Sequence, residues 1–306
     1  MLKDIPTPGK GQAARRRALR GQACIVAAAI LWSFGGLFIK TLMAEPYSVR
    51  PYALACIRSL FAGLALAWAL PGLRGAPPIR VASATVAYAV LILTYVLANF
   101  HTTAANAILL QYFYPLIVAV GAVAVYRERL HTKTVAALAI GMAGVTVIAA
   151  GSWQPGEWLG VGLGLSSAVA YGVFLLIQRG IPTGSPVALA SLYNLLTAAA
   201  ILPLAIGELA MPPEAWAIIA VQGVVQIGIP YVLLFKGLRL TSAITAAVIT
   251  LGEAVLNPLW VWLGVGESPS AWTITGGCAI IAALLIQFLA KANGNNAHRA
   301  AGREVQ

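Results

Sequence analysis

The stretch LGEAVLNPLW, residues 251–260, lies inside a run of more than twenty largely apolar residues. Its carboxylate, Glu253, is further from the nearest loop than any other acidic side chain in the sequence. About 20 apolar residues suffice for a helix to cross a bilayer, and a charge at that depth is costly unless it faces a cavity or a partner. The stretch therefore predicts a membrane-spanning helix with one polar side that faces inward.

Three residues of this stretch share one helical face. Glu253, Asn257 and Trp260 are spaced i, i+4 and i+7, which places them on the same side of an α-helix. Pro258 lacks a backbone donor and predicts a bend in the helix at that point. Glu253 is a candidate to bind a substrate ammonium group or to carry a coupling proton. The alternative is a protonated glutamate that bonds a neighbouring carbonyl group.

The composition excludes a soluble protein. The chain is 60% hydrophobic and 9% charged, with a mean hydropathy of +0.84, whereas soluble domains have about 25% charged residues. The net charge of +11 would also suit nucleic acid, but the basic residues lie in the tails and in short loops beside apolar runs, which is a signal of membrane orientation. Cys24, Cys56 and Cys278 have no metal-site spacing, so we expect no metal, no other cofactor and no nucleic acid partner.

Apolar runs separated by short turn-forming connections predict ten spans and an all-α polytopic membrane protein. We place the spans at about 21–41, 51–70, 81–98, 102–126, 134–151, 158–179, 187–207, 215–236, 241–264 and 271–290.

The basic residues predict the orientation of these spans. All but three of the 20 lysines and arginines fall in the two tails or at and beyond the ends of the even-numbered spans. Basic residues mark the cytoplasmic side, so we expect both termini in the cytoplasm. The basic tail at 1–20 is expected to be disordered, and the tail at 291–306 is polar again.

An internal repeat divides the spans into two halves, residues 21–151 and 158–290. A shift of 139 residues aligns the halves without a gap from the first span to the fourth, and the fifth pair slips by three, which aligns Gly141 with Gly277. Because each half has an odd number of spans, the halves insert in opposite senses, an arrangement common in transporters whose site lies between the halves. The other matched pairs are Trp32 with Tyr171, Lys40 with Arg179, Thr102 with Thr241, Ala104 with Ala243, Ala107 with Ala246, and Glu128 with Glu267.

Several segments together resemble a known family. They are AILWSF at 29–34 with Arg58, TTAANAILLQYFYP at 102–115, YRERL at 126–130, YVLLFKGLRLTSA at 231–243 and GE at 266–267. In their order and spacing the chain resembles the ten-helix drug/metabolite transporter superfamily of the EamA type, and within it the bacterial aromatic amino acid exporters. The resemblance implies two inverted five-helix repeats, and a central pocket lined by spans 1, 3, 4, 6, 8 and 9.

One departure from the family pattern concerns Glu253. Relatives commonly have Glu-Pro in the middle of span 9, whereas here Ala254 follows the glutamate and the proline stands at position 258. The matching pair of the first half is Tyr114-Pro115. A mechanism that needs two symmetric carboxylates is therefore in doubt for this chain.

Other polar and aromatic residues at helical spacing are further candidates for substrate binding. Each has a plainer alternative, because polar groups also bond helix to helix, and tyrosines also form interfacial belts. The candidates are Gln111 and Tyr114 in span 4, Tyr88 and Tyr95 in span 3, Gln222 and Gln226 in span 8, and the matched pair Trp32 and Tyr171 in spans 1 and 6.

Charged residues within or at the ends of spans have two interpretations. Arg58 could meet a substrate carboxylate, but an arginine in a span also commonly snorkels to the interface or pairs within the bundle. Glu128 and Glu267, which end the matched spans 4 and 9, are interpreted as structural caps or as partners in a gate.

The leading hypothesis is a monomeric secondary transporter of the bacterial inner membrane that exports amino acids, aromatic or other apolar ones, or related small metabolites by alternating access. Its partners would be the substrate, the lipid bilayer and, where transport is coupled, protons. The alternatives are multidrug or cation efflux, an enzyme embedded in the membrane, and a channel. The sequence has no HExxH, GxSxG or Walker motif, so neither catalysis nor ATP-driven transport is indicated.

Overall fold

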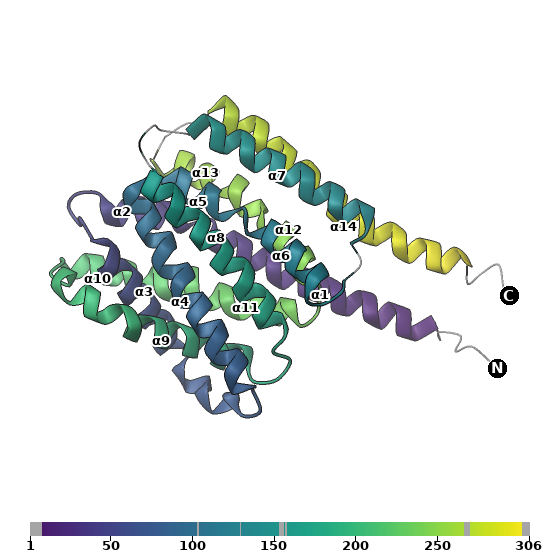
Figure 1. Cartoon of the computed structure of the whole chain (residues 1–306), viewed down its shortest axis with the longest axis horizontal. Coiled ribbons are helices and arrows are strands. Elements are labelled where there is room, and N and C mark those ends of the chain that lie inside the picture. Colours follow the sequence, from purple (N-terminus) through teal and green to yellow (C-terminus); the bar gives the residue numbers. More distant parts are fainter. Residues whose placement is uncertain are drawn as a thin grey trace.

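The computed structural model describes residues 8–102, 104–128, 130–152, 156, 158–265 and 270–301, and every regular element in these ranges is a helix (Figure 1). The first half contains α1 (Pro8–Trp32), α2 (Gly35–Met43), α3 (Pro51–Ala65), the 3-10 helix η1 (Ala67–Leu73), α4 (Pro78–His101), α5 (Ala104–Gln111), α6 (Tyr114–Ala124) and α7 (Thr132–Ser152). The second half contains α8 (Trp158–Arg179), α9 (Pro186–Ala205), the 3-10 helix η2 (Ile206–Glu208), α10 (Pro213–Val221), the π-helix η3 (Gln222–Gly228), α11 (Ile229–Leu238), α12 (Ala243–Thr250), α13 (Gly252–Val265) and α14 (Ala271–Ala301).

Each predicted span has a helical counterpart. Eight segments of the described chain are long and apolar enough to cross a membrane, and a ninth forms if α3 and η1, which are bent by 72°, count as one span. The tenth predicted span corresponds to the shorter apolar part of α14, Ala271–Gln287. The prediction of an all-α polytopic membrane protein is confirmed.

The predicted tails are partly helical. The disorder expected for residues 1–20 is wrong for residues 8–20, because α1 begins at Pro8 and continues without a break into the first span. In the same way α14 runs on to Ala301, well beyond its apolar part. The outer ends of α1 and α14 lie at the same end of the molecule (Figure 1).

Helix packing follows a pseudo-two-fold relationship between the halves. In the third and sixth spans, α4 packs against α8. The counterpart of α4 in the other half is α11 and the counterpart of α8 is α1, and these two helices also pack together. α3 lies against α9, its counterpart, and α7 lies along α14, its counterpart, as Figure 1 shows for the latter pair. This is the packing that an inverted repeat requires.

The matched spans 4 and 9 are both interrupted near their centres. α5 ends at Gln111 and α12 ends at Thr250, positions that the 139-residue shift superposes. In the first half, Pro115 cannot donate a backbone hydrogen bond and accounts for the break before it. In the second half the interruption falls at Leu251, beside Gly252, and α13 continues through position 258. Pro258 therefore causes no break in the helix, and the interruption lies upstream, beside the poor helix former Gly252.

An aromatic cluster fills the centre of the bundle. Tyr88, Phe174, Tyr193, Tyr231 and Phe235 contact one another with ring centroids 4.9 to 6.1 Å apart. Such edge-to-face and tilted contacts are the favoured geometry of buried rings.

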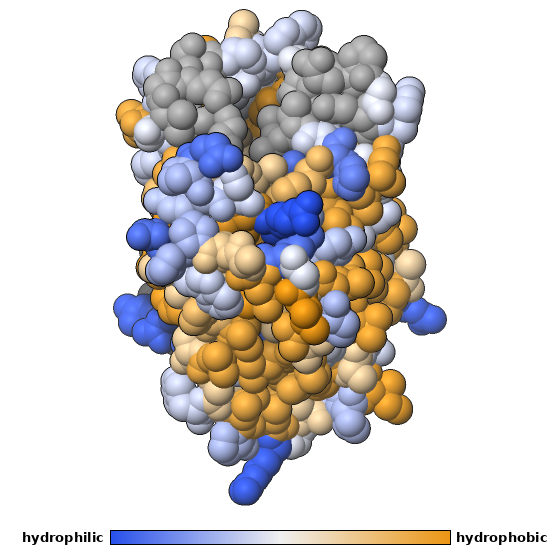
Figure 2. Space-filling view, turned by 90° about the vertical axis from the view of Figure 1, so that its left-hand side faces the viewer, coloured by the Kyte–Doolittle hydropathy of each residue, from blue (hydrophilic) through white to orange (hydrophobic). Residues whose placement is uncertain are grey.

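Large apolar side chains cover the outside of the bundle. Val86 and Val90 on α4, Leu202 and Leu204 on α9, and Ile206 after it are all exposed. Figure 2 shows hydrophobic residues over much of the lower half of one face. An apolar exterior of this extent suits contact with lipid chains.

Candidate functional site

A small cavity lies between the two halves, and eight different helices contribute to its wall. Its volume is about 40 Å³, which corresponds to space for a few water molecules. Six of the predicted site residues line it: Trp32, Tyr95, Gln111, Tyr171, Gln226 and Glu253. The wall is completed by Arg58, Leu91, Ile92, Ile227 and Tyr231.

Glu253 reaches this cavity from the interruption in span 9. It is in the first turn of α13 and near the middle of the 22-residue segment Ala243–Gly264. A carboxylate in the first turn of a helix is favoured by the unpaired backbone N–H groups there. Within the described part of the chain, no side chain forms an ion pair or a hydrogen bond with Glu253. Its carboxylate is therefore presented to the cavity.

Arg58 is a second charged residue of the cavity wall, although the sequence left its role open between a substrate contact and a structural one. Its side chain is only 1% exposed, so the alternative that it snorkels to the interface is wrong. The guanidinium carbon lies 5.9 Å from the centroid of the Tyr95 ring, close enough for a cation–π contact. Its Nε atom is buried without a hydrogen-bond partner.

Tyr231 was missed, because a π-helical turn changes the helix periodicity. In an α-helix, residues five apart such as Gln226 and Tyr231 would point about 140° away from each other. The π-helix η3 widens the turn between them, and both residues line the cavity. The α-helical spacing used to choose the candidate residues does not predict this π-helical turn.

The aromatic rings at the cavity come from both halves of the chain and contact one another. The Trp32 ring contacts Tyr171 at 6.4 Å and Tyr231 at 5.0 Å between centroids. Tyr114, the counterpart of Glu253, packs on Tyr171 at 4.3 Å. Its hydroxyl forms a hydrogen bond with the Thr250 hydroxyl, so Tyr114 lies behind the cavity wall and joins spans 4 and 9.

Two other predicted residues are buried outside the cavity. Tyr88 is fully buried and donates a hydrogen bond to Asn194 Oδ1 at 2.9 Å, while its ring supports Tyr231 at 4.9 Å. Gln222 is fully buried in η3, and neither polar atom of its amide has a partner in the described chain.

Asn257, Trp260 and Gln226 gather around the break between α1 and α2. The Trp260 indole N–H donates to Ser33 Oγ at 2.7 Å, and its ring stacks on Phe34 at 4.7 Å. Gln226 Nε2 donates a hydrogen bond to the backbone carbonyl of Trp32 at 3.2 Å. Asn257 packs on the backbone at Gly36, where an added Cβ atom would collide with Asn257 Oδ1. Of the three residues predicted to share one helical face, Glu253 therefore lines the cavity, whereas Asn257 and Trp260 support the break between α1 and α2.

Comparison with known proteins identifies the family. The model of the EamA-like transporter family matches the chain twice, at residues 19–150 and 158–289. The chain belongs to this family. The two matches start 139 residues apart, which is the shift found within the sequence.

Two individual proteins are similar to this EamA-family chain over most of its length. An uncharacterized transporter of Archaeoglobus fulgidus is 29% identical over 272 residues, which cover 88% of this chain and 96% of that protein. A protein of known crystal structure has the same fold, with a TM-score of 0.73 and 21% identity over 88% of this chain and 96% of its own.

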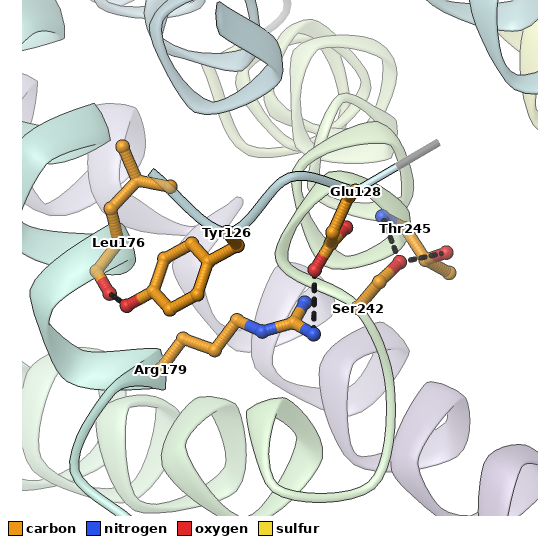
Figure 3. A network of polar contacts seen from close by, with 6 residues as sticks. All are labelled: Tyr126, Glu128, Leu176, Arg179, Ser242 and Thr245. Carbon is orange, nitrogen blue, oxygen red and sulfur yellow. Dashed lines mark hydrogen bonds and ion pairs between the residues drawn. The ribbon is translucent and has the colours of Figure 1, made fainter. Parts of the chain in front are cut away.

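The end of the EamA fold that carries the termini is closed by polar contacts between the halves (Figure 3). Arg179 Nη2, at the end of α8, lies 2.6 Å from Glu128 Oε1 after α6. The Tyr126 ring faces the Arg179 guanidinium at 5.5 Å, and its hydroxyl donates to the Leu176 carbonyl. The interpretation of Glu128 as a gate partner agrees with this pairing, whereas Glu267 lies outside the described residues.

Further contacts join the same end of the two halves. Arg80 donates to the Gly180 carbonyl, and Thr183 Oγ1 donates to the Gly75 carbonyl at 2.6 Å. At the opposite end, Glu208 Oε2 accepts hydrogen bonds from the backbone N–H groups of Tyr52 at 2.7 Å and Ala53 at 3.0 Å. Glu208 therefore caps the first turn of α3 from the other half.

Proposed function

We propose that this EamA-family protein is a secondary transporter that exports amino acids, aromatic or other apolar ones, across a bacterial inner membrane by alternating access. The observation that carries the proposal is the cavity between the inverted halves, with Glu253 exposed to it and aromatic rings on several sides. Rings offer stacking surfaces to an apolar side chain, and a carboxylate offers a partner to an ammonium group.

The size of the cavity supports a mechanism in which the halves move. At about 40 Å³ it is far smaller than the roughly 300–1,000 Å³ of ordinary small-molecule sites. A substrate can enter only when one end opens and the helices separate. The breaks in spans 1, 4 and 9 provide places where short helical segments can reorient.

The distribution of charge supports the orientation. The groove between α1 and α11 at the terminal end holds Arg20, Lys236 and Arg239. Basic residues are retained on the cytoplasmic side, so the end closed by Glu128 and Arg179 faces the cytoplasm in this proposal. Opening of that end would admit substrate, and its closure would precede release outside.

Efflux of cationic compounds is a second candidate function. Glu253 forms no ion pair with any described residue and shares the cavity wall with Trp32 and Tyr95. This arrangement would also suit an organic cation, because aromatic faces attract such ligands. In that case transport would not require a carboxylate on the substrate.

Uptake into proteoliposomes tests both functions. Radiolabelled phenylalanine, leucine and a quaternary ammonium dye are compared for the wild type, Glu253→Gln and the control Glu214→Gln, whose exposed side chain is in the first turn of α10. We expect amino acid transport that is lost in Glu253→Gln and kept in Glu214→Gln. Transport of the dye alone would favour the efflux function, and no solute crossing faster than in empty liposomes would refute transport.

A further inference from the structure

We propose that Arg58 binds the carboxylate of the substrate while Glu253 binds its ammonium group, so that the cavity selects zwitterionic α-amino acids over amines and acids of the same shape. This inference rests on the proposed transport function and names the substrate class of the same site.

Arg58 carries a positive charge and forms no ion pair with the residues that the structure describes. It is on α3, inside the membrane-spanning part, and its side chain is 1% exposed. Its polar contact in the described chain is the Tyr95 ring, and its Nε atom has no partner. A cation–π contact compensates only part of the cost of burying a guanidinium group. A carboxylate that enters the cavity would supply the missing charge with the forked geometry that arginine prefers.

Glu253 supplies the negatively charged group of the same cavity. The two charged groups both line it, yet they form no ion pair within the described chain. Tyr95 and Tyr231 also line the cavity, and the Arg58 guanidinium lies over the Tyr95 ring. The cavity wall therefore carries a cationic group, an anionic group and aromatic rings, and a ligand with both charges and an apolar side chain matches this wall.

The position of Arg58 is set by a close helix contact. The π-helix η3 approaches α3 so closely that a Cβ atom on Gly223 would overlap the Arg58 carbonyl oxygen. Arg58 therefore belongs to the first half and is held against η3, whereas Glu253 belongs to the second half. A zwitterion that bridges them would connect the halves through its own charges, which links occupancy of the site to their closure.

A matched ligand series tests the selectivity with the wild-type protein. Phenylalanine, phenethylamine and 3-phenylpropionate share the ring and differ in their charged groups. Each is tested as an unlabelled competitor of phenylalanine uptake into proteoliposomes. A lone buried charge left unpaired by the wrong ligand is penalised strongly, so we expect phenylalanine to compete at least about 10-fold better than either analogue. Equal competition by phenethylamine would overturn the role of Arg58 while leaving transport intact.

Variants of Arg58 and Glu253 test which charged group of the ligand each residue recognises. In direct binding of the three ligands to purified protein, Arg58→Gln should bind phenylalanine more weakly and lose discrimination against phenethylamine, whereas Glu253→Gln should lose discrimination against 3-phenylpropionate. Arg58→Lys, which keeps the charge, should retain part of the preference. The control Arg74→Gln changes an exposed arginine after η1 and should behave as the wild type.

The outcomes separate this inference from the proposed function. If the wild type transports neither phenylalanine nor leucine, the proposed transport of amino acids is itself refuted. If it transports phenylalanine and Arg58→Gln keeps the same ligand order, the proposed function stands and the inference about Arg58 fails. Because the competition series uses unmodified protein, the inference remains refutable even where Arg58→Gln does not fold.

Discussion

Glu128 of the first half and Arg179 of the second half form an ion pair with 2.6 Å between Oε1 and Nη2. The two side chains are 20% and 26% exposed, so the pair is partly shielded from water. It joins the segment after α6 to the end of α8, and it lies in the network that closes the terminal end of the bundle (Figure 3).

Removal of this pair should loosen the closed end. Ion pairs with solvent access contribute about 0.2–1 kcal/mol, so Arg179→Gln should raise the population of the open end by a factor of roughly 1.4 to 5. The measurement is the labelling rate of a cysteine placed at Ala122, a buried position of α6, by a hydrophilic maleimide. Glu128→Gln should give a similar rate, and the double variant should add little to either. Fully additive effects would contradict the direct pairing.

Tyr126 should act in the same closure independently of pH. Burial raises the pKa of its hydroxyl, and the neighbouring Arg179 and Arg80 oppose that shift in part. A raised folded-state pKa means that the contribution to stability is complete below the ordinary value of about 10 and declines only above it. Tyr126→Phe should therefore speed labelling at position 122 by the same factor at pH 6 and pH 9. A factor that differs between these two pH values would contradict the assignment.

The contact between Gly223 and α3 should not tolerate a methyl group. A Cβ atom at position 223 would meet the Arg58 backbone, and overpacking of this kind costs about 1–3 kcal/mol. Gly223→Ala should lower the unfolding temperature in detergent and reduce transport. Gly162→Ala is the matched control, because nothing lies within 4 Å of a Cβ atom at that position. It should be neutral or slightly stabilising, since alanine favours helix.

Trp260 should stabilise the break between α1 and α2 through its hydrogen bond and its ring. Trp260→Phe removes the bond to Ser33 and keeps the stacking on Phe34, so we expect a loss of about 0.5–1.5 kcal/mol. Trp260→Ala removes both and should cost more than Trp260→Phe, but less than the roughly 3–5 kcal/mol of a fully buried tryptophan, because the ring is only partly buried. Thermal unfolding of both variants measures the difference, and equal losses would show that stacking contributes nothing.

The candidate site was only partly predictable. Helical spacing identified Tyr95, Gln111, Gln226 and Glu253, and the internal repeat identified Trp32 and Tyr171; all six line the cavity. It also suggested Asn257 and Trp260, which instead support the break between α1 and α2. Spacing along a helix tells which residues share a face. It does not tell which helices pack against each part of that face, because those helices are remote in sequence.

Apolar runs, the distribution of basic residues and the 139-residue repeat determined from the sequence alone that the chain is a bundle of membrane helices in two inverted halves. These properties are local or periodic, because burial in lipid acts on each span separately. Only the tertiary structure decided that Arg58 turns inward, that η3 brings Tyr231 beside Gln226, and that Glu253 meets a cavity at the break in span 9. These arrangements depend on close packing between spans of different halves, which no single stretch of sequence encodes.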